Sequence, residues 1–549
     1  MGRPCRWEGG GAGRAITGWL LLGSAVMVTQ AVAVWPAAAQ DTPSLSVASD
    51  TVLAWGQNNQ GELGDGTTAN RTTPVAVNLP AGTTITAISA VGDFSLAFTS
   101  TGGVLAWGAN SSGQLGDGTT TNRTTPVAVS LPVGAEVIAI AAGDDHCLAL
   151  TSTGGVLAWG QNDQGELGDG TMIDRTTPVA VSLPTGVTIT AITGGNNHSL
   201  ALTSTGTILA WGSNFGGQLG DGTIIDRSTP VNVNLPAGVT ITAIAAHGDH
   251  SLALTSTGAV LAWGDNSSGQ LGDGTTTNRT TPVAVSLPVG AEVTAIAGGS
   301  DHSLALTSTG GVLAWGQNDQ GELGDGTMID RTTPVAVSLP TGVTITAITG
   351  GNNHSLAVTS TGTVLAWGAN FDGHLGDGTT TNRSTPVNVN LPPATAITAV
   401  AAGDAHSLAL TAPPTSATTL QVTPVNPTAD QDITLTATVT CNVDTPTGTI
   451  TFHTNTTTLA TVPLTTSATH TTTLPTGTHT LTAHYTSTNT CPDSQSPPTT
   501  ITIAPPLDER DLPITGPNMT TTTGAAALSI LAGVVLSYAA RRRPPHRAA

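Results

Sequence analysis

Six histidines occupy one position of a repeated sequence, each 52 residues after the last. They are His146, His198, His250, His302, His354 and His406, and Phe94 holds the equivalent position in the first copy. Imidazole is a common metal ligand, so a ring of histidines suggests metal binding. Metal ligation needs the side chains around one ion, whereas the copies of a repeat fan out in space. We therefore predict structural histidines that bond the backbone, and no metal site.

A carboxylate recurs in every copy, within the segment Leu-Gly-Asp-Gly-Thr. The aspartates are Asp65, Asp117, Asp169, Asp221, Asp273, Asp325 and Asp377; the arginines that follow them are Arg71, Arg123, Arg175, Arg227, Arg279, Arg331 and Arg383. A calcium loop needs several carboxylates that converge on one ion, and no loop has that density. Asp-Gly is a strong turn signal, so we predict turns in which each arginine bonds locally.

No nucleophile–base pair, phosphate loop or zinc motif is visible in the sequence. Cys147 replaces a serine found in other copies, and we predict that it is a buried free thiol. These observations favour a protein that is not an enzyme and has no cofactor. The formal net charge is −20 and the chain has no lysine, which excludes nucleic-acid binding through clustered basic residues.

Tryptophan marks the repeat that must position these residues. Ala-Trp-Gly recurs with constant spacing at Trp55, Trp107, Trp159, Trp211, Trp263, Trp315 and Trp367. Seven units fit residues 48–411. A unit such as 239–285 predicts four short strands, at 241–245, 251–255, 260–263 and 282–285, of which the last starts with proline. Four strands in each of several repeated units are typical of a β-propeller, here with seven blades.

The chain enters the repeat midway, at 52–55, and leaves it after 406–410. Six units therefore hold their second and third strands together, and the seventh must combine both ends of the repeat region. Such a joint closes the ring and removes open sheet edges.

The unit His-Ser-Leu-Ala-Leu-Thr-Ser-Thr-Gly-x-Val-Leu-Ala-Trp-Gly, followed by Asn-x-x-Gly-Gln-Leu-Gly, resembles the regulator of chromosome condensation repeat family. The resemblance covers all seven units and implies a seven-bladed propeller with a joined blade. The founding member is a nucleotide-exchange factor that binds chromatin, a function that an acidic, exported chain is not expected to share. Exported bacterial members that inhibit β-lactamases imply protein binding through the blade loops.

Apolar residues replace polar ones in the long loop of some units. They are the candidate binding residues Met172, Ile173, Phe215, Ile224, Ile225, Met328, Ile329 and Phe371. Apolar side chains on a polar loop favour a contact patch for a partner. The alternative is that they pack against the neighbouring blade.

A second domain is predicted at 419–504, where threonine-rich segments alternate with period two. The stretch 448–452, followed by Leu-Pro-Thr-Gly at 474–477, resembles bacterial immunoglobulin-like domains, which implies a small β-sandwich that acts as a stalk. Cys441 and Cys491 are its only cysteines. Outside the cell we expect a disulfide that pins a loop; two free thiols are the alternative.

The N-terminus has the pattern of a secretory signal peptide. Basic residues precede an apolar run at 16–34, and three alanines at 37–39 close the segment. We predict cleavage after Ala39, so that residues 1–39 are a signal peptide.

The C-terminal residues 505–549 combine a linker with a second targeting signal. Leu512, Pro513, Ile514, Thr515 and Gly516 precede a polar spacer, an apolar run at 525–540 and three arginines. This resembles the LPXTG sorting signal of Gram-positive surface proteins. It implies that a sortase joins Thr515 to peptidoglycan while the apolar run lies transiently in the membrane. A tail-anchored membrane protein is the alternative.

These features predict an all-β chain: a seven-bladed β-propeller followed by an immunoglobulin-like sandwich, secreted and attached to the cell wall. The leading hypothesis is an adhesion or interaction module with an unknown protein or surface ligand. A structural coat or spacer without a ligand is the alternative that the near-identical units favour. A propeller enzyme is the third hypothesis, since propellers hold active sites at the central channel, but the sequence lacks the clustered acids that it requires.

Overall fold

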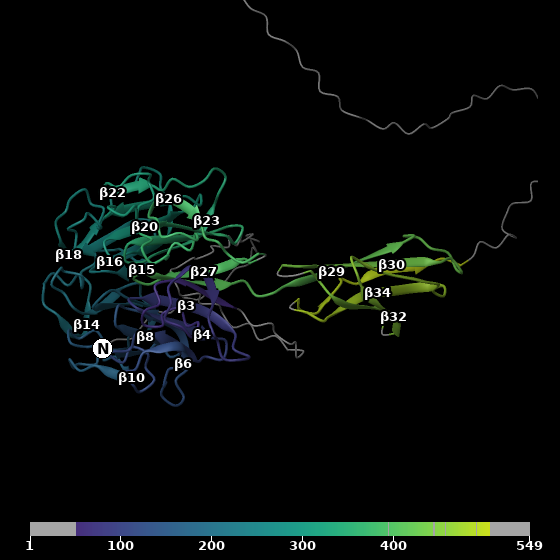
Figure 1. Cartoon of the computed structure of the whole chain (residues 1–549), viewed down its shortest axis with the longest axis horizontal. Coiled ribbons are helices and arrows are strands. Elements are labelled where there is room, and N and C mark those ends of the chain that lie inside the picture. Colours follow the sequence, from purple (N-terminus) through teal and green to yellow (C-terminus); the bar gives the residue numbers. More distant parts are fainter. Residues whose placement is uncertain (1–50, 394, 443–444, 456, 490, 506–549) are drawn as a thin grey trace, which may run out of the picture.

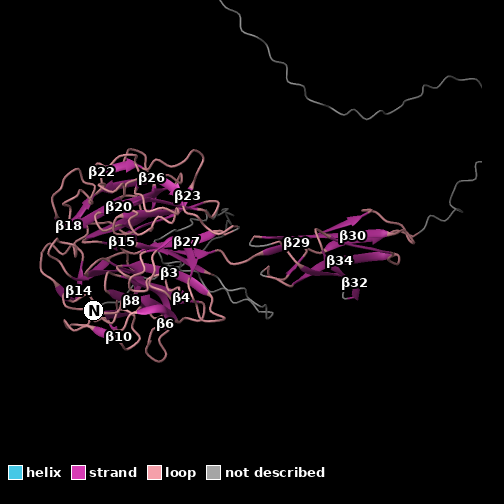
Figure 2. Ribbon diagram, in the orientation of Figure 1, coloured by secondary structure: helices cyan, strands magenta, loops and turns pink. Residues whose placement is uncertain are grey.

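The computed structural model describes residues 51–505 except 394, 443–444, 456 and 490. The described residues form strands and loops and contain no helix (Figure 2). Two bodies of strands follow one another along the chain, a large one up to Thr411 and a small one from Ser416 (Figure 1). The predicted all-β class is confirmed.

Seven four-stranded antiparallel sheets make up the large body, and each is one blade. The strands of each blade are given from the innermost outward. Blade 1 consists of β3 (Ile85–Val91), β4 (Phe94–Thr99), β5 (Val104–Gly108) and β6 (Arg123–Ala128); blade 2 of β7 (Val137–Ala142), β8 (His146–Thr151), β9 (Val156–Gly160) and β10 (Arg175–Ala180); and blade 3 of β11 (Ile189–Gly194), β12 (His198–Thr203), β13 (Ile208–Gly212) and β14 (Arg227–Asn232). Blade 4 consists of β15 (Ile241–His247), β16 (His250–Thr255), β17 (Val260–Gly264) and β18 (Arg279–Ala284); blade 5 of β19 (Val293–Gly298), β20 (His302–Thr307), β21 (Val312–Gly316) and β22 (Arg331–Ala336); and blade 6 of β23 (Ile345–Gly350), β24 (His354–Thr359), β25 (Val364–Gly368) and β26 (Arg383–Asn388).

Blade 7 joins the two ends of the propeller sequence. Its strand order is β27 (Ile397–Ala402), β28 (His406–Thr411), β1 (Val52–Gly56) and β2 (Arg71–Ala76). Val52 pairs with Leu410 and Gly56 pairs with His406. The ring is therefore closed by strand pairing, as the sequence predicts.

The apolar cores lie between neighbouring blades. The third strand of each blade, Val-Leu-Ala-Trp-Gly or Ile-Leu-Ala-Trp-Gly, is buried at all five positions. One core cluster combines Leu96 and Val104 of blade 1 with Ile140 and Trp159 of blade 2. Because a core needs residues from two blades, a single blade cannot bury its own apolar faces.

Each tryptophan also forms a polar link to the blade before it. The Nε1–H of Trp211 donates a hydrogen bond of 2.7 Å to the backbone oxygen of Glu166, in the long loop of blade 2. Trp55 closes the ring with the same bond, at 2.9 Å, to the backbone oxygen of His374. The indole N–H thus has a buried acceptor. The same bond recurs at all seven contacts between neighbouring blades, which we call seams.

The outermost strand begins earlier than the sequence analysis predicts. In blade 4, β18 starts at Arg279, and Pro282 lies inside it. The register with β17 shifts between Ala262 and Gly264. A proline is tolerated there because an outermost, irregular strand does not require every N–H to bond a neighbour.

The second body is a β-sandwich with its own core. One sheet contains β29 (Ser416–Thr423), β30 (Ile433–Cys441) and β33 (Ala468–Thr472); the other contains β31 (Gly448–Thr454), β32 (Thr457–Leu464), β34 (Gly477–Ser487), β35 (Ser494–Gln495) and β36 (Thr499–Ile503). Leu435, Phe452 and Tyr485 are buried between the sheets. Cys441 and Cys491 form a disulfide that connects the end of β30 with the loop between β34 and β35.

Among the described residues, no helix is long and apolar enough to cross a membrane. The predicted signal peptide, the sorting motif from Leu512 to Gly516 and the apolar run at 525–540 lie outside the described residues.

We predict that Trp211→Phe lowers the free energy of unfolding of the chain by about 1–3 kcal/mol, because it removes a buried inter-blade hydrogen bond while the ring remains apolar. Urea denaturation followed by circular dichroism measures the change. Trp55→Phe should cost a similar amount, since the closing seam uses the same bond. A much smaller loss of stability in Trp55→Phe would contradict the claim that the bond at the closing contact contributes as much as the bonds between the other blades.

Candidate functional site

The strand directions divide the propeller loops between two faces. Within each blade, the turn between the first and second strands and the long loop between the third and fourth strands lie at the same end. We call this end the loop face. The chain enters at Val52 and leaves at Thr411, and both residues lie at the opposite end. The sandwich domain therefore connects to the face away from the long loops.

A salt bridge fixes each long loop internally. In blade 3, Oδ2 of Asp221 accepts bonds from Nε and Nη2 of Arg227 at 3.0 and 2.7 Å. Oδ1 accepts bonds from the backbone N–H and hydroxyl of Thr223. Partial burial alone would raise the pKa of Asp221, but the bonds from Thr223 and Arg227 lower it below its ordinary value. The predicted turn chemistry and local arginine bonding are confirmed in all seven units.

A buried asparagine holds the two arms of each loop together. In blade 3, Oδ1 of Asn214 accepts the N–H of Leu219, and Nδ2 donates to the backbone oxygens of Thr223 and Ile225. The sequence analysis did not select this position, although asparagine recurs there in every unit. The rigid loop gives its variable residues a fixed support.

The recurring histidines link neighbouring blades. Nε2 of His198 lies 2.9 Å from Oγ of Ser251 in the next blade, and that hydroxyl donates to the backbone oxygen of Gln218. The histidine therefore bonds a side chain, rather than the backbone as predicted. Burial lowers the pKa of His198 to about 3, so the ring is neutral. Among the described residues, no group of His, Cys, Asp or Glu is arranged to hold a metal ion.

One seam replaces both members of the histidine–serine pair. Blade 1 carries Phe94 in the histidine position, and blade 2 carries Cys147 in the corresponding serine position. Both are fully buried in the same apolar cluster, and Sγ of Cys147 lies 3.2 Å from the backbone oxygen of Gln114. Cys147 is a buried free thiol, and burial raises its pKa well above the ordinary value. The two substitutions compensate each other because neither leaves an unpaired polar partner.

The loop face exposes all eight candidate binding residues. Their side chains are 49% to 64% exposed, so they do not pack into the neighbouring blade. Blades 2 and 3 carry the larger apolar patch, which consists of Met172, Ile173, Phe215, Ile224 and Ile225. Blades 5 and 6 carry the smaller apolar patch, which consists of Met328, Ile329 and Phe371. Large exposed apolar side chains on well-ordered loops are typical of contact surfaces.

The acidic residues gather on the same face. Apart from Glu136 and Glu292, every Asp and Glu of the described propeller lies in a long loop or in a first turn of a blade. The seven propeller arginines each pair with the aspartate of their own loop. Near the axis, burial and the charges of Asp404, Asp145, Asp93 and Asp249 raise the pKa of Asp144 to about 8. The loop face thus carries uncompensated acids.

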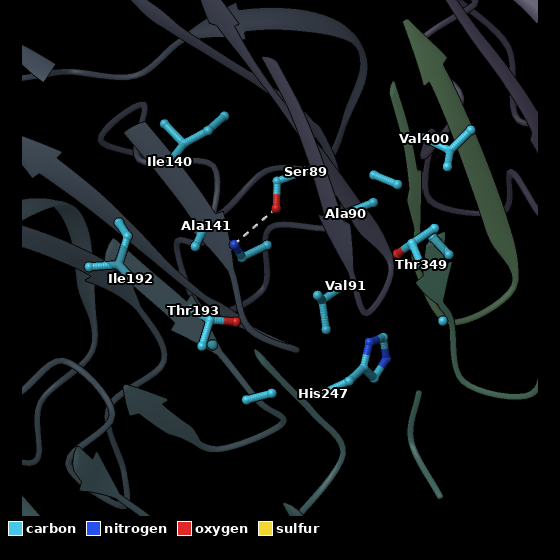
Figure 3. A pocket seen from close by; sticks show the side chains of 16 residues that line it. Ser89, Ala90, Val91, Ile140, Ala141, Ile192, Thr193, His247, Thr349 and Val400 are labelled. Atoms are coloured by element: carbon cyan, nitrogen blue, oxygen red, sulfur yellow. Dashed lines mark hydrogen bonds between the residues drawn. The ribbon is translucent and has the colours of Figure 1, made fainter. Parts of the chain in front are cut away.

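The central channel is narrow. Residues of six innermost strands line a cavity of about 40 Å³, and His247 projects into it where other units have glycine or valine (Figure 3). Oγ of Ser89 accepts the backbone N–H of Ala142 across this space at 3.2 Å. Burial lowers the pKa of His247 to about 4. Such a volume holds a few waters rather than a small-molecule substrate.

These observations define the class of protein: a closed seven-bladed propeller with an immunoglobulin-like sandwich after it. The family model of the RCC1-like domain matches residues 51–409, and the model of the bacterial Ig-like domain (group 3) matches residues 420–504. The chain belongs to the RCC1-like domain family.

Known proteins of plants and animals are similar to the propeller. The ultraviolet-B receptor UVR8 of Arabidopsis thaliana is 32% identical over 341 residues, which covers 62% of this chain and 78% of the receptor. The E3 ubiquitin-protein ligase HERC2 of Homo sapiens is 32% identical over 367 residues, 66% of this chain but only 8% of the ligase.

Solved structures show the same fold. Prp20p of Saccharomyces cerevisiae, described with its binding properties to Gsp1p and histones, has 26% identity and a TM-score of 0.59 over 67% of this chain and 93% of Prp20p. Human WBSCR16 has 25% identity and a TM-score of 0.60 over 66% of this chain and 99% of that protein.

We predict non-additive stability at the exceptional seam. Phe94→His should cost about 1–3 kcal/mol, because a buried imidazole then lacks its serine. Adding Cys147→Ser should recover on the order of 1 kcal/mol by restoring the pair of the other seams. A double-mutant cycle by urea denaturation measures this coupling. If the two substitutions changed the free energy of unfolding additively, the result would contradict the claim that Phe94 and Cys147 compensate each other.

We also predict that Glu166→Gln changes the pH dependence of stability. Burial raises the pKa of Glu166 to about 7, from an ordinary 4.5. Between these pH values the folded chain keeps a proton that the unfolded chain has lost, so this group makes stability fall as pH rises. The buried histidines titrate identically in both proteins. The variant should therefore gain stability relative to the parent from pH 4.5 to 7, as measured by urea denaturation. A difference in stability between variant and parent that does not change with pH would contradict the raised pKa of Glu166.

Proposed function

We propose that this chain is an exported surface protein whose propeller binds a protein partner through the loop face. The observation that carries the proposal is that all eight apolar loop residues are exposed on the face opposite the connection to the sandwich domain. A partner can reach this face while the sandwich domain acts as a stalk on the other side.

The charge of the loop face indicates the chemistry of the partner. Acidic residues follow the apolar residues in the same long loops, as Asp174, Asp226 and Asp330 do, and each propeller arginine forms a salt bridge with the aspartate of its own loop. A partner surface that combines basic and apolar residues would complement this arrangement. Protein binding agrees with the similarity to Prp20p, whose structure is described with its binding properties to Gsp1p and histones.

The terminal segments supply the proposed location. The signal pattern at 1–39 would direct export, and the motif from Leu512 to Gly516 would let a sortase join Thr515 to peptidoglycan. The disulfide between Cys441 and Cys491 suits an oxidising environment outside the cell.

A structural coat without a ligand is the second candidate. Residues 161–200 are repeated without change at 317–356, and recently copied units have had little time to specialise. The binding experiment below distinguishes the two candidates.

We predict that threonine substitutions abolish partner binding without loss of the fold. Met172, Ile173, Ile224 and Ile225 would be changed together to Thr, the residue that blades 1, 4 and 6 carry at these positions. The chain and the variant would be immobilised and exposed to secreted, wall and host-tissue extracts, and bound proteins would be identified by mass spectrometry. A saturable partner that the variant loses by more than about tenfold supports the proposal. No capture by either protein would favour the coat, whereas equal capture by both would contradict the proposal that the larger apolar patch is the binding surface.

We predict that Thr515→Ala moves the protein from the wall fraction to the membrane fraction and the culture medium, because a sortase would no longer cleave after residue 515 and the apolar run at 525–540 would stay on the chain. Fractionation of a Gram-positive host followed by immunoblotting measures the distribution. Wall attachment that survives the substitution would rule out Thr515 as the point of attachment.

A further inference from the structure

A second feature of the loop face lies beside the smaller apolar patch. A pocket of about 280 Å³ opens where blades 6, 7 and 1 meet, and its lining consists of Gln57, Asp93, Asn352, Asn353, Ala369, Phe371, Asp372, His374, Asp404 and Ala405. Its volume lies at the lower end of ligand pockets, which suits one side chain or a small ligand.

The pocket lies at a contact between blades that lacks a cross-link present at three others. In blade 3, the equivalent of His374 is Gln218, whose Nε2 lies 3.3 Å from Oδ1 of Asp249 and 3.4 Å from Oγ of Ser213. The same Gln–Asp bond occurs between Gln114 and Asp145. At the pocket, Ala405 replaces the aspartate, so this cross-link is absent and the space stays open.

Three carboxylates face the open space without a counter-cation. Asp93 accepts a bond from Nε2 of Gln57, and Asp372 accepts one from Nδ2 of Asn70. Among the described residues, none of Asp93, Asp372 and Asp404 belongs to a salt bridge. Burial first, and then the charges of Asp93 and Asp145, raises the pKa of Asp404 to about 6. This environment favours a bound cation.

His374 is the one buried histidine among the described residues whose two ring nitrogens both lack a hydrogen-bond partner. Its side chain lines the pocket and is only 3% exposed. Burial lowers the pKa of His374 to about 4, and the nearby Ala369 backbone offsets this only in part without forming a well-aligned hydrogen bond, so the ring is neutral and offers one acceptor nitrogen. A buried polar group without a partner costs free energy that a ligand with donors would recover.

We propose that this pocket binds a guanidinium group, in the form of an arginine side chain of the partner. A guanidinium offers five donors in a plane, which matches several carboxylates and amide oxygens better than a point charge does. Its flat face can stack on Phe371, which stands exposed at the rim. The carboxylates are not arranged as a metal site among the described residues, which favours an organic cation.

The inference rests on the proposed function in one respect, namely that the loop face is the binding face. The test uses the full-length chain and two small probes, N-acetyl-L-arginine amide and the isosteric, uncharged N-acetyl-L-citrulline amide. Isothermal titration should show one saturable site for the arginine probe and at least about tenfold weaker binding of citrulline. Equal affinities, or no binding of either probe, would overturn the proposal.

A closing variant locates the site. His374→Gln with Ala405→Asp copies the Gln218–Asp249 pair, so the fold tolerates it, and it adds a negative charge while filling the space. Loss of arginine binding in this variant supports the pocket. Retained or stronger binding would overturn it, because general charge attraction would then explain the affinity.

Matched rim variants complete the test. Phe371→Ser should weaken arginine binding severalfold, whereas Phe215→Ser, at the same position of blade 3, should leave it unchanged; equal effects would overturn the stacking role.

If a captured protein binds but the arginine probe does not, only the pocket inference fails. If the probe binds but no protein does, the proposed function fails and the pocket stands.

Discussion

The structure depends on one backbone carbonyl in each long loop. In blade 2 the oxygen of Glu166 accepts both the indole N–H of Trp211 and the hydroxyl of Ser199 from blade 3. Equivalent bonds to the oxygens of Glu62 and His374 belong to other seams, including the one that closes the ring. Because these acceptors are buried, each bond avoids the cost of an unpaired carbonyl. Blades and loops are thereby fixed together, and the apolar cores fill the rest of each seam.

Much of the variation in exposed side chains lies on the loop face, whereas the contacts between blades differ at a few places, such as Phe94 with Cys147 and His374 with Ala405. The threonines and prolines of the outer strands are nearly constant, whereas the loop tips carry Thr-Thr, Met-Ile, Ile-Ile or, in blade 7, Thr-Ala. After the copied segments 161–200 and 317–356, the two halves diverge on the loop face, as at Gln218 and His374, and also in buried strands, as at Leu202 and Val358. These differences create the larger patch in one half and the pocket at His374 in the other. In the proposed function, the differences between units, rather than the shared residues, would set the choice of partner.

Much of the fold could be predicted because its cause is periodic. The spacing of tryptophan gave the blade number, and the entry at Val52 implied the joined blade. The partner of the histidines was missed because His198 and Ser251 meet across a seam, and a period does not show which neighbours touch. The pocket was also missed. Comparison of the units could have found it, since Gln114 occurs with Asp145 and Glu166 with Asn197, whereas His374 occurs with Ala405. Exposure of the apolar loop residues needed the structure.

The central claim is that the loop face binds a partner on the cell surface. Met172 and Met328 are half exposed on this face and are the only methionines of the described residues, so they report on it directly. Hydrogen peroxide would be applied to intact cells with and without the captured partner, and sulfoxide at each methionine would be followed by mass spectrometry. Our account predicts rapid oxidation of both residues on bare cells and clear protection of at least one by the partner. Oxidation that the partner leaves unchanged at both residues would contradict the account.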